Sequence, residues 1–149
     1  GFYYNMFSFI PAIKSQGAII QNYGGDKKEP WVSPLDIASA IVEEIEKPFE
    51  GRTIRYIASD EVSPNEAATI LGKAIGQPDL KWQVVSDEQF LSALLAIGFN
   101  PQAARGYTEM NASRRCNAYE DYNLHKPQKL GKVKLTHFAG EFAGAFNKK

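Results

Sequence analysis

Apolar residues recur at helical spacing in several parts of the chain. The pattern predicts helices over residues 34–47, 64–75 and 86–98, and a closing helix over 135–146. Residues 2–16 show similar spacing, which predicts a buried helix, or a strand leading into one, with a kink at Pro11. Residues 101–116 are also expected to be helical, although their apolar stripe is less regular.

Three segments have the composition of strands. They are "AIIQNY" at 18–23, "TIRYIAS" at 53–59 and "LKWQVV" at 80–85, and the second has the clearest alternation of β-branched and aromatic residues. The stretches 24–30 and 118–132 are polar and are expected to be loops. Because helices and strands alternate, we expect an α/β fold with some parallel strand pairing.

Three of the predicted helices begin with the same type of sequence. "SPLD" at 33–36 and "SPNE" at 63–66 place serine at the N-cap, proline at the first helical position and a carboxylate at the third. "SDEQ" at 86–89 is a version without proline. This spacing predicts capping boxes, in which Asp36, Glu66 and Gln89 accept a hydrogen bond from the N–H of the cap residue.

Charge and cysteine content narrow the class of protein. The 149 residues carry 17 Lys plus Arg and 17 Asp plus Glu, so the net charge gives no attraction to nucleic acid or to an anionic membrane. The apolar runs are shorter than the roughly 20 residues of a membrane helix. The single cysteine, Cys116, excludes an internal disulfide and a multi-cysteine zinc site. We therefore expect one cytoplasmic domain without a metal, nucleic-acid or membrane partner.

Signatures of known catalytic or cofactor sites are weak. The sequence contains no G-x-G-x-x-G or phosphate-binding loop, and no G-x-S-x-G. Tyr-x-x-x-Lys occurs at Tyr23/Lys27 and Tyr122/Lys126, but the first spans two glycines and the second precedes a proline, so neither is expected to be catalytic. The two histidines lack neighbours at metal-ligand spacing. The catalytic residues thus stay unknown.

The beginning of the chain, "GFYYNMFSFIPAI", is unusually rich in aromatic residues and has no initiator methionine. Two interpretations remain open for its aromatic side chains: the wall of a pocket or part of the core. Because chain ends are usually polar, we also expect that a preceding segment belongs to the protein.

The order of segments resembles the C-terminal half of the NmrA-like proteins, which are atypical short-chain dehydrogenase/reductase relatives of the NAD(P)-binding Rossmann superfamily. The resemblance lies in "GFYYN", in the "DIA" helix start at 36–38, and in "ASDEVSPNEAATILGKAIG" at 58–76, and it extends to the closing helix. It covers nearly the whole chain, but none of these motifs is a catalytic signature.

The resemblance implies that residues 1–149 form one unit: the last strand or strands of a Rossmann-like sheet and a small substrate-binding α/β lobe. The fold would be incomplete without an N-terminal half, which would carry the glycine-rich turn and most NAD(P) contacts. It also implies a cleft for cofactor and substrate, with Asp36 capping the helix beside it. The residues implied at the cleft are Phe2, Tyr3, Asn5, Met6, Trp31 and Val32.

The function implied is that of the substrate-side part of an NAD(P)-dependent oxidoreductase, acting on a small apolar or carbonyl-bearing molecule. This chain alone would then be inactive. Two alternatives remain: a non-catalytic NAD(P)-sensing regulator, and a plain protein-interaction domain. An incomplete sheet leaves an unpaired edge strand, so we also expect self-association through that edge or through the aromatic face.

Overall fold

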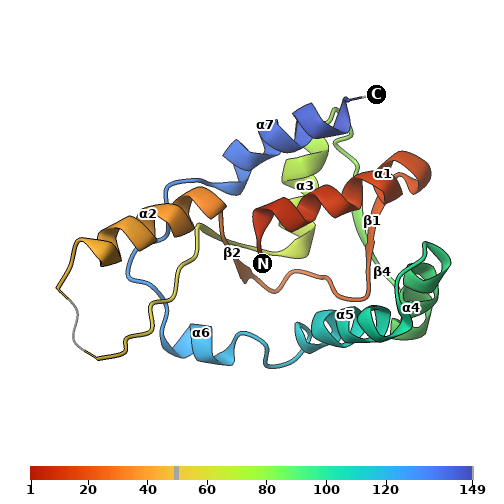
Figure 1. Ribbon diagram of the computed structural model, residues 1–149. Coiled ribbons are helices and arrows are strands. Elements are labelled where there is room, and N and C mark those ends of the chain that lie inside the picture. Colours follow the sequence, from red (N-terminus) through yellow and green to blue (C-terminus); the bar gives the residue numbers. More distant parts are fainter. Residues whose placement is uncertain (49–50, 149) are drawn as a thin grey trace.

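The computed structural model describes residues 1–48 and 51–148, which form helices around two short sheets (Figure 1). One sheet pairs β1 (Ala18–Gln21) with β4 (Lys81–Val84) in parallel, with Ile19 opposite Trp82. The other pairs β2 (Glu29–Trp31) with β3 (Asp60–Val62) in antiparallel fashion. A bridge between Phe2 and Val32 adds a third extended segment beside β2. The α/β class and the parallel pairing are as expected.

The helices account for most of the regular structure. In chain order they are η1 (Tyr3–Phe9, a 3₁₀-helix), α1 (Ile10–Gln16), α2 (Pro34–Ile45), α3 (Pro64–Ala74), α4 (Asp87–Ala96), α5 (Pro101–Ser113), α6 (Glu120–Leu124) and α7 (Leu135–Phe146). Pro11 lies in the first turn of α1, where it needs no hydrogen-bond partner. It therefore marks the change from η1 to α1 rather than a kink within one helix.

The main core lies between η1, β1, β4, α3 and α7. Its largest fully buried side chains include Tyr3, Met6, Leu71, Phe138 and Phe142. A second, smaller cluster of Phe90, Leu94 and Ala104 holds α4 against α5 and is separate from the main core. Figure 1 places these two helices at one end of the molecule, beyond the ends of β1 and β4. The α4–α5 hairpin is thus a distinct packing unit.

Two of the three predicted capping boxes are present. Ser63 with Glu66, and Ser86 with Gln89, each exchange hydrogen bonds between side chain and backbone. The prediction for Asp36 is wrong. Ser33 caps α2 by accepting from the N–H of Leu35, and its own N–H donates to the Ser59 hydroxyl, at 2.8 Å, rather than to the Asp36 carboxylate.

The Asp36 carboxylate instead holds the segment that leads into α7. It accepts hydrogen bonds from the backbone N–H groups of Lys132 and Val133, both at 3.0 Å, and from the hydroxyl of Ser59 at 2.6 Å. Gly131 lies so close to this carboxylate that a side chain at position 131 would clash with Asp36 Oδ2. Burial raises the pKa of Asp36, but the Ser59 and backbone hydrogen bonds outweigh burial and lower the pKa below its ordinary value.

Three further expectations are corrected by the structure. Residues 53–59 lie outside any strand and Ile54 is 74% exposed, although the Ser59 N–H at the end of the segment donates to the Trp31 carbonyl of β2 at 2.7 Å. The predicted loop 118–132 contains α6. The stripe expected along α2 is buried only at Ala40, while Ile41 and Ile45 face outward.

None of the helices in residues 1–48 and 51–148 is long and apolar enough to cross a membrane.

Candidate functional site

A groove of about 680 Å³ lies between the N-terminal helices and the α4–α5 hairpin. One wall is formed by η1 and α1 and the other by α4, α5 and their connection. Ile20 and Gln21 of β1 lie between the two walls. The groove therefore adjoins the carboxyl end of β1, which is where open α/β sheets place their ligands.

The two walls differ in chemistry. The wall from η1 and α1 carries the polar side chains of the groove, Tyr4, Asn5, Ser8, Ser15 and Gln16, together with the apolar Phe9, Pro11 and Ala12. The opposite wall is aliphatic and aromatic: Phe90, Ala93, Leu94, Ile97, Phe99 and Tyr107. A ligand between them would meet hydrogen-bonding groups on one side and an apolar surface on the other.

The apolar wall contains a short aromatic stack. The Tyr107 ring lies 5.8 Å from the Phe90 ring and 6.4 Å from the Phe99 ring, and its plane is within 15° of that of Phe99. Ile97, at the end of α4, is 74% exposed although it borders this stack. Such an exposed apolar margin suits a planar apolar ligand, which would cover it.

Every described residue that lines the groove is uncharged at neutral pH. A buried charge without a partner is costly, so the groove is unsuited to a ligand whose ionic group must enter it. The serine hydroxyls already donate to backbone carbonyls, Ser8 to Asn5 and Ser15 to Pro11. The amides of Asn5 and Gln16 are thus the main polar groups that this wall offers to a ligand.

The residues predicted at the cleft are only partly brought to the groove. Asn5 lines it, whereas Phe2 and Val32 face each other in the extended bridge beside β2. Three more are buried in the main core: Tyr3, Met6 and Trp31. For the aromatic segment, both interpretations apply, because Tyr3 and Phe9 are core residues while Tyr4 and Phe9 also border the groove.

Two buried polar atoms near the start of the chain have no hydrogen-bond partner in the described structure: the Tyr3 hydroxyl and Trp31 Nε1. Burial, followed by the carboxylates of Asp60 and Asp36, raises the pKa of Tyr3 well above its ordinary value. Its hydroxyl therefore stays protonated and could donate a hydrogen bond, but it is unsuited to act as a base. The assignment of Tyr3 and Trp31 to a cleft remains a prediction.

A second, smaller hollow of about 170 Å³ lies on the other side of the loop after β1. Three of its basic residues are paired with carboxylates: Arg114 with Glu29, Arg115 with Asp87 and Lys28 with Glu66. A fourth, Lys27, donates to the backbone carbonyl of Cys116 at 3.5 Å. Arg114 also lies over the ring of Tyr23, 3.9 Å from its centre. We attribute this cluster to the stability of the fold.

The Tyr-x-x-x-Lys motifs have structural positions. Tyr122 and Lys126 both contact the same oxygen of Glu61, at 2.9 Å and 2.8 Å, and so attach α6 to β3. Burial and the hydrogen bond to Glu61 raise the pKa of Tyr122, which opposes a role as a proton acceptor. Burial also raises the pKa of Tyr23, although the Arg114 guanidinium over its ring acts to lower it.

Two observations concern metal and thiol groups. Among residues 1–48 and 51–148, no group of three or more His, Cys, Asp or Glu side chains is placed to hold a metal ion. Cys116 is exposed at the surface after α5.

The sequence pattern alone did not identify the apolar wall of the groove. Phe90 and Leu94 fit the buried stripe of a helix, and both also pack in the small cluster of the hairpin. The exposed pair Ile97 and Phe99, next to the predicted helix end at Gly98, was the available signal. Apolar residues at an exposed helix end often mark a binding surface.

Comparison with known proteins gives structural matches only. No protein-family model matches the chain, and no curated protein matches its sequence. Among solved structures, an NADPH-dependent quinone oxidoreductase from Escherichia coli matches with a TM-score of 0.71 and 19% identity, over 95% of this chain and 52% of that protein. A triphenylmethane reductase from Citrobacter, solved with NADP(H), matches with a TM-score of 0.61 and 18% identity, over 91% of this chain and 47% of that protein.

At this level of identity, the matches establish the fold alone. The chain spans about half the length of the solved structures that it matches. The chain therefore has the same fold as about half of each of these two reductases.

Proposed function

We propose that this chain forms the substrate-side portion of an NAD(P)-dependent oxidoreductase of the NmrA-like type, and that the groove holds the substrate. The observation that carries this proposal is the groove itself: uncharged, apolar on one side, polar on the other, and located at the carboxyl end of β1. The similarity in fold to NADPH-dependent reductases supports it.

The chemistry of the groove favours an uncharged, planar substrate with one polar edge. The Phe99–Tyr107 stack would receive its flat face, while Asn5 and Gln16 would hydrogen-bond its polar edge. A carbonyl-bearing aromatic compound such as a naphthoquinone has this character. Two-electron reduction by a reduced nicotinamide would add one hydride and one proton to such a quinone, which gives the hydroquinone and the oxidised nicotinamide. Among the described residues that line the groove, Tyr4 and Tyr107 carry hydroxyls that could donate the proton.

A charge at the margin of the groove should weaken binding of a neutral apolar probe. We expect Ile97→Lys to reduce the affinity for Nile red about fivefold, since about 1 kcal/mol of apolar contact is lost. Probe fluorescence measures this. Ile54→Lys is the matched control, because Ile54 is equally exposed, at 74%, and does not border the groove. Equal affinities of the two variants would place the probe, and the proposed substrate site, elsewhere.

Binding of the NAD(P) cofactor should require residues other than those that line the groove. The sequence contains no glycine-rich turn to hold a pyrophosphate, so we expect no saturable binding when the chain is titrated with NADPH and followed by nicotinamide fluorescence. Reduced nicotinamide mononucleotide, which has the same fluorescent ring, serves as the control for non-specific quenching. Saturable binding of NADPH in the micromolar range would contradict the proposal that this chain supplies the substrate side of the site and not the cofactor side.

A further inference from the structure

The apolar wall of the groove is joined to the rest of the molecule by polar contacts at one end. The α4–α5 hairpin has its own apolar cluster of Phe90, Leu94 and Ala104, which is separate from the main core. Its tip, around Gly98, is distant along both helices from the place where α4 begins and α5 ends. What holds the hairpin therefore acts at its base.

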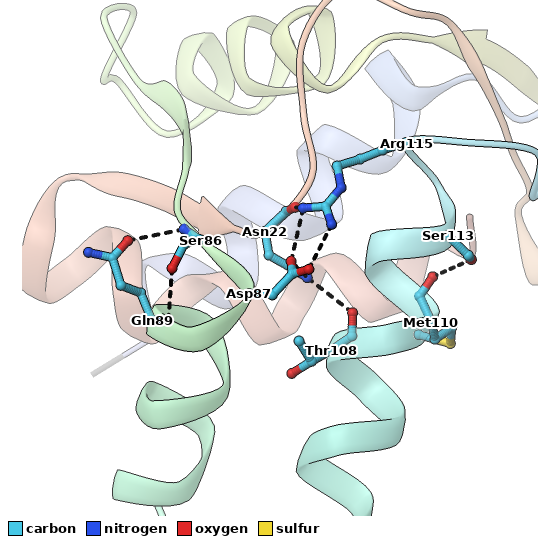
Figure 2. Close-up of polar contacts among 8 residues, drawn as sticks. All are labelled: Asn22, Ser86, Asp87, Gln89, Thr108, Met110, Ser113 and Arg115. Carbon is cyan, nitrogen blue, oxygen red and sulfur yellow. Dashed lines mark hydrogen bonds and ion pairs between the residues drawn. The ribbon is translucent and has the colours of Figure 1, made fainter.

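Three residues meet at this base: Asn22 after β1, Asp87 at the start of α4 and Arg115 just after α5 (Figure 2). Arg115 binds both oxygens of Asp87, at 2.9 Å and 2.7 Å, and donates to the carbonyl of Asn22 at 2.7 Å. The Asn22 amide donates to Asp87 at 2.8 Å. Figure 2 shows the Asp87 carboxylate between the other two side chains.

Asn22 also holds the second helix of the hairpin. Its amide donates to the backbone carbonyl of Thr108 in α5 at 3.0 Å. The neighbouring Gln21 accepts from Asn111 of the same helix at 3.0 Å and also borders the groove. Asn22 is fully buried, yet its own side-chain oxygen has no partner in the described structure. One amide group thus ties both helices of the hairpin to the end of β1.

We propose that Asn22, Asp87 and Arg115 form a latch that sets the width of the groove and so determines the size of the ligand it accepts. The hairpin acts as a lever. Its ten-residue α4 is about 15 Å long, so a rotation of about 10° at the base would move the tip by about 2–3 Å. Ile97 and Phe99 lie at that tip and would move most.

The width can be measured without a ligand. Spin labels at Ser15 and Ala93, one on each wall and both exposed, would report the distance across the groove in a Cys116→Ser background. Ala93 lies about 9 Å beyond the start of α4, so the same rotation of about 10° in Arg115→Gln should lengthen the mean distance by about 1–2 Å or broaden its distribution. Amide hydrogen exchange in α4 and α5 should become about fivefold faster, while exchange in α3 and α7 stays unchanged.

Arg55→Gln is the matched control. Arg55 is exposed to 41%, against 42% for Arg115, and it also contacts carboxylates twice, at Glu43 and Glu44. It lies outside the hairpin, so its loss should leave the label distance and the exchange of α4 and α5 unaltered. Unchanged distances and exchange in Arg115→Gln, or equal changes in both variants, would overturn the latch.

Asn22→Ala should lengthen the label distance more than Arg115→Gln does. Because Asn22 is buried, a variant at this position can fail to fold, so the test relies on the exposed Arg115. The claim about ligand size rests on the function proposed above, whereas the claim about width does not. If the unaltered chain fails to bind Nile red, the proposed function is contradicted, and the label distances still show whether the latch sets the width of the groove. If it binds and Arg115→Gln leaves the affinity unchanged despite a wider groove, the link to ligand size is contradicted.

Discussion

Replacing Glu29 by glutamine is expected to lower the free energy of unfolding by about 3 kcal/mol, because it leaves a buried guanidinium without its counter-charge. Glu29 is 5% exposed and accepts from both Nε and Nη2 of Arg114. Arg114 is held between the rings of Tyr23 and Trp31, so it cannot readily turn to water. Urea unfolding followed by Trp fluorescence measures the loss.

Glu43→Gln provides the matched control for this change. Glu43 also pairs with an arginine, Arg55, at 2.6 Å, but its side chain is 57% exposed. Exposed pairs of this kind contribute about 0–1 kcal/mol. We therefore expect a difference of at least about 2 kcal/mol between the two variants. Equal losses would mean that water reaches Arg114 and that burial does not govern the pair.

Asp36→Ala should cost about 3 kcal/mol, since it removes the acceptor of three hydrogen bonds at once. The hydroxyl of Ser59 and the backbone N–H groups of Lys132 and Val133 would lose their partner. Asp36→Asn should recover less than half of this loss, because its amide has only one acceptor oxygen. Chemical unfolding of both variants gives the comparison, with Asp26→Ala, which removes a single exposed contact to Asn65, as the control.

The pH dependence of this contribution has a defined sign. The pKa of Asp36 is below its ordinary value of 3.8 in the folded chain, so the native state holds the proton less tightly than the unfolded state. The contribution is then fully present above pH values near 4 and is lost as the pH falls through the lowered pKa. The gap in stability between the unaltered chain and Asp36→Ala should narrow there. A gap that is constant down to about pH 2 would contradict the assigned role.

The helix starts could be predicted because their determinants are local. Ser63 and Glu66, or Ser86 and Gln89, are three residues apart and complete their hydrogen bonds within one turn. Asp36 has the same local pattern, but its partners lie 96 and 97 residues further along the chain. Spacing alone cannot distinguish these two cases.

The strand prediction at 53–59 failed for a related reason. Alternating residues favour a strand only where a neighbouring strand supplies hydrogen bonds and a covered face. Ile54 has neither among the described residues and is exposed. The sequence pattern thus indicated a capacity for pairing, and the described part of the chain does not use it.

The candidate groove was only half predictable. The polar wall includes Asn5, which lies in the aromatic N-terminal segment that the sequence marked as unusual. The opposite wall is formed by Phe90, Leu94 and Tyr107, which a sequence pattern treats as ordinary core. Which face of a helix borders a hollow depends on how distant elements assemble.

The Asn22–Asp87–Arg115 contacts also bear on the order in which the chain folds. They join residues 28, 65 and 93 positions apart, whereas the packing of α4 on α5 is local. Closing such long loops costs chain entropy before any contact is gained. The hairpin can therefore collapse on itself early, but its attachment must await the pairing of β1 with β4. The groove should be among the last features to form on folding and among the first to open on unfolding.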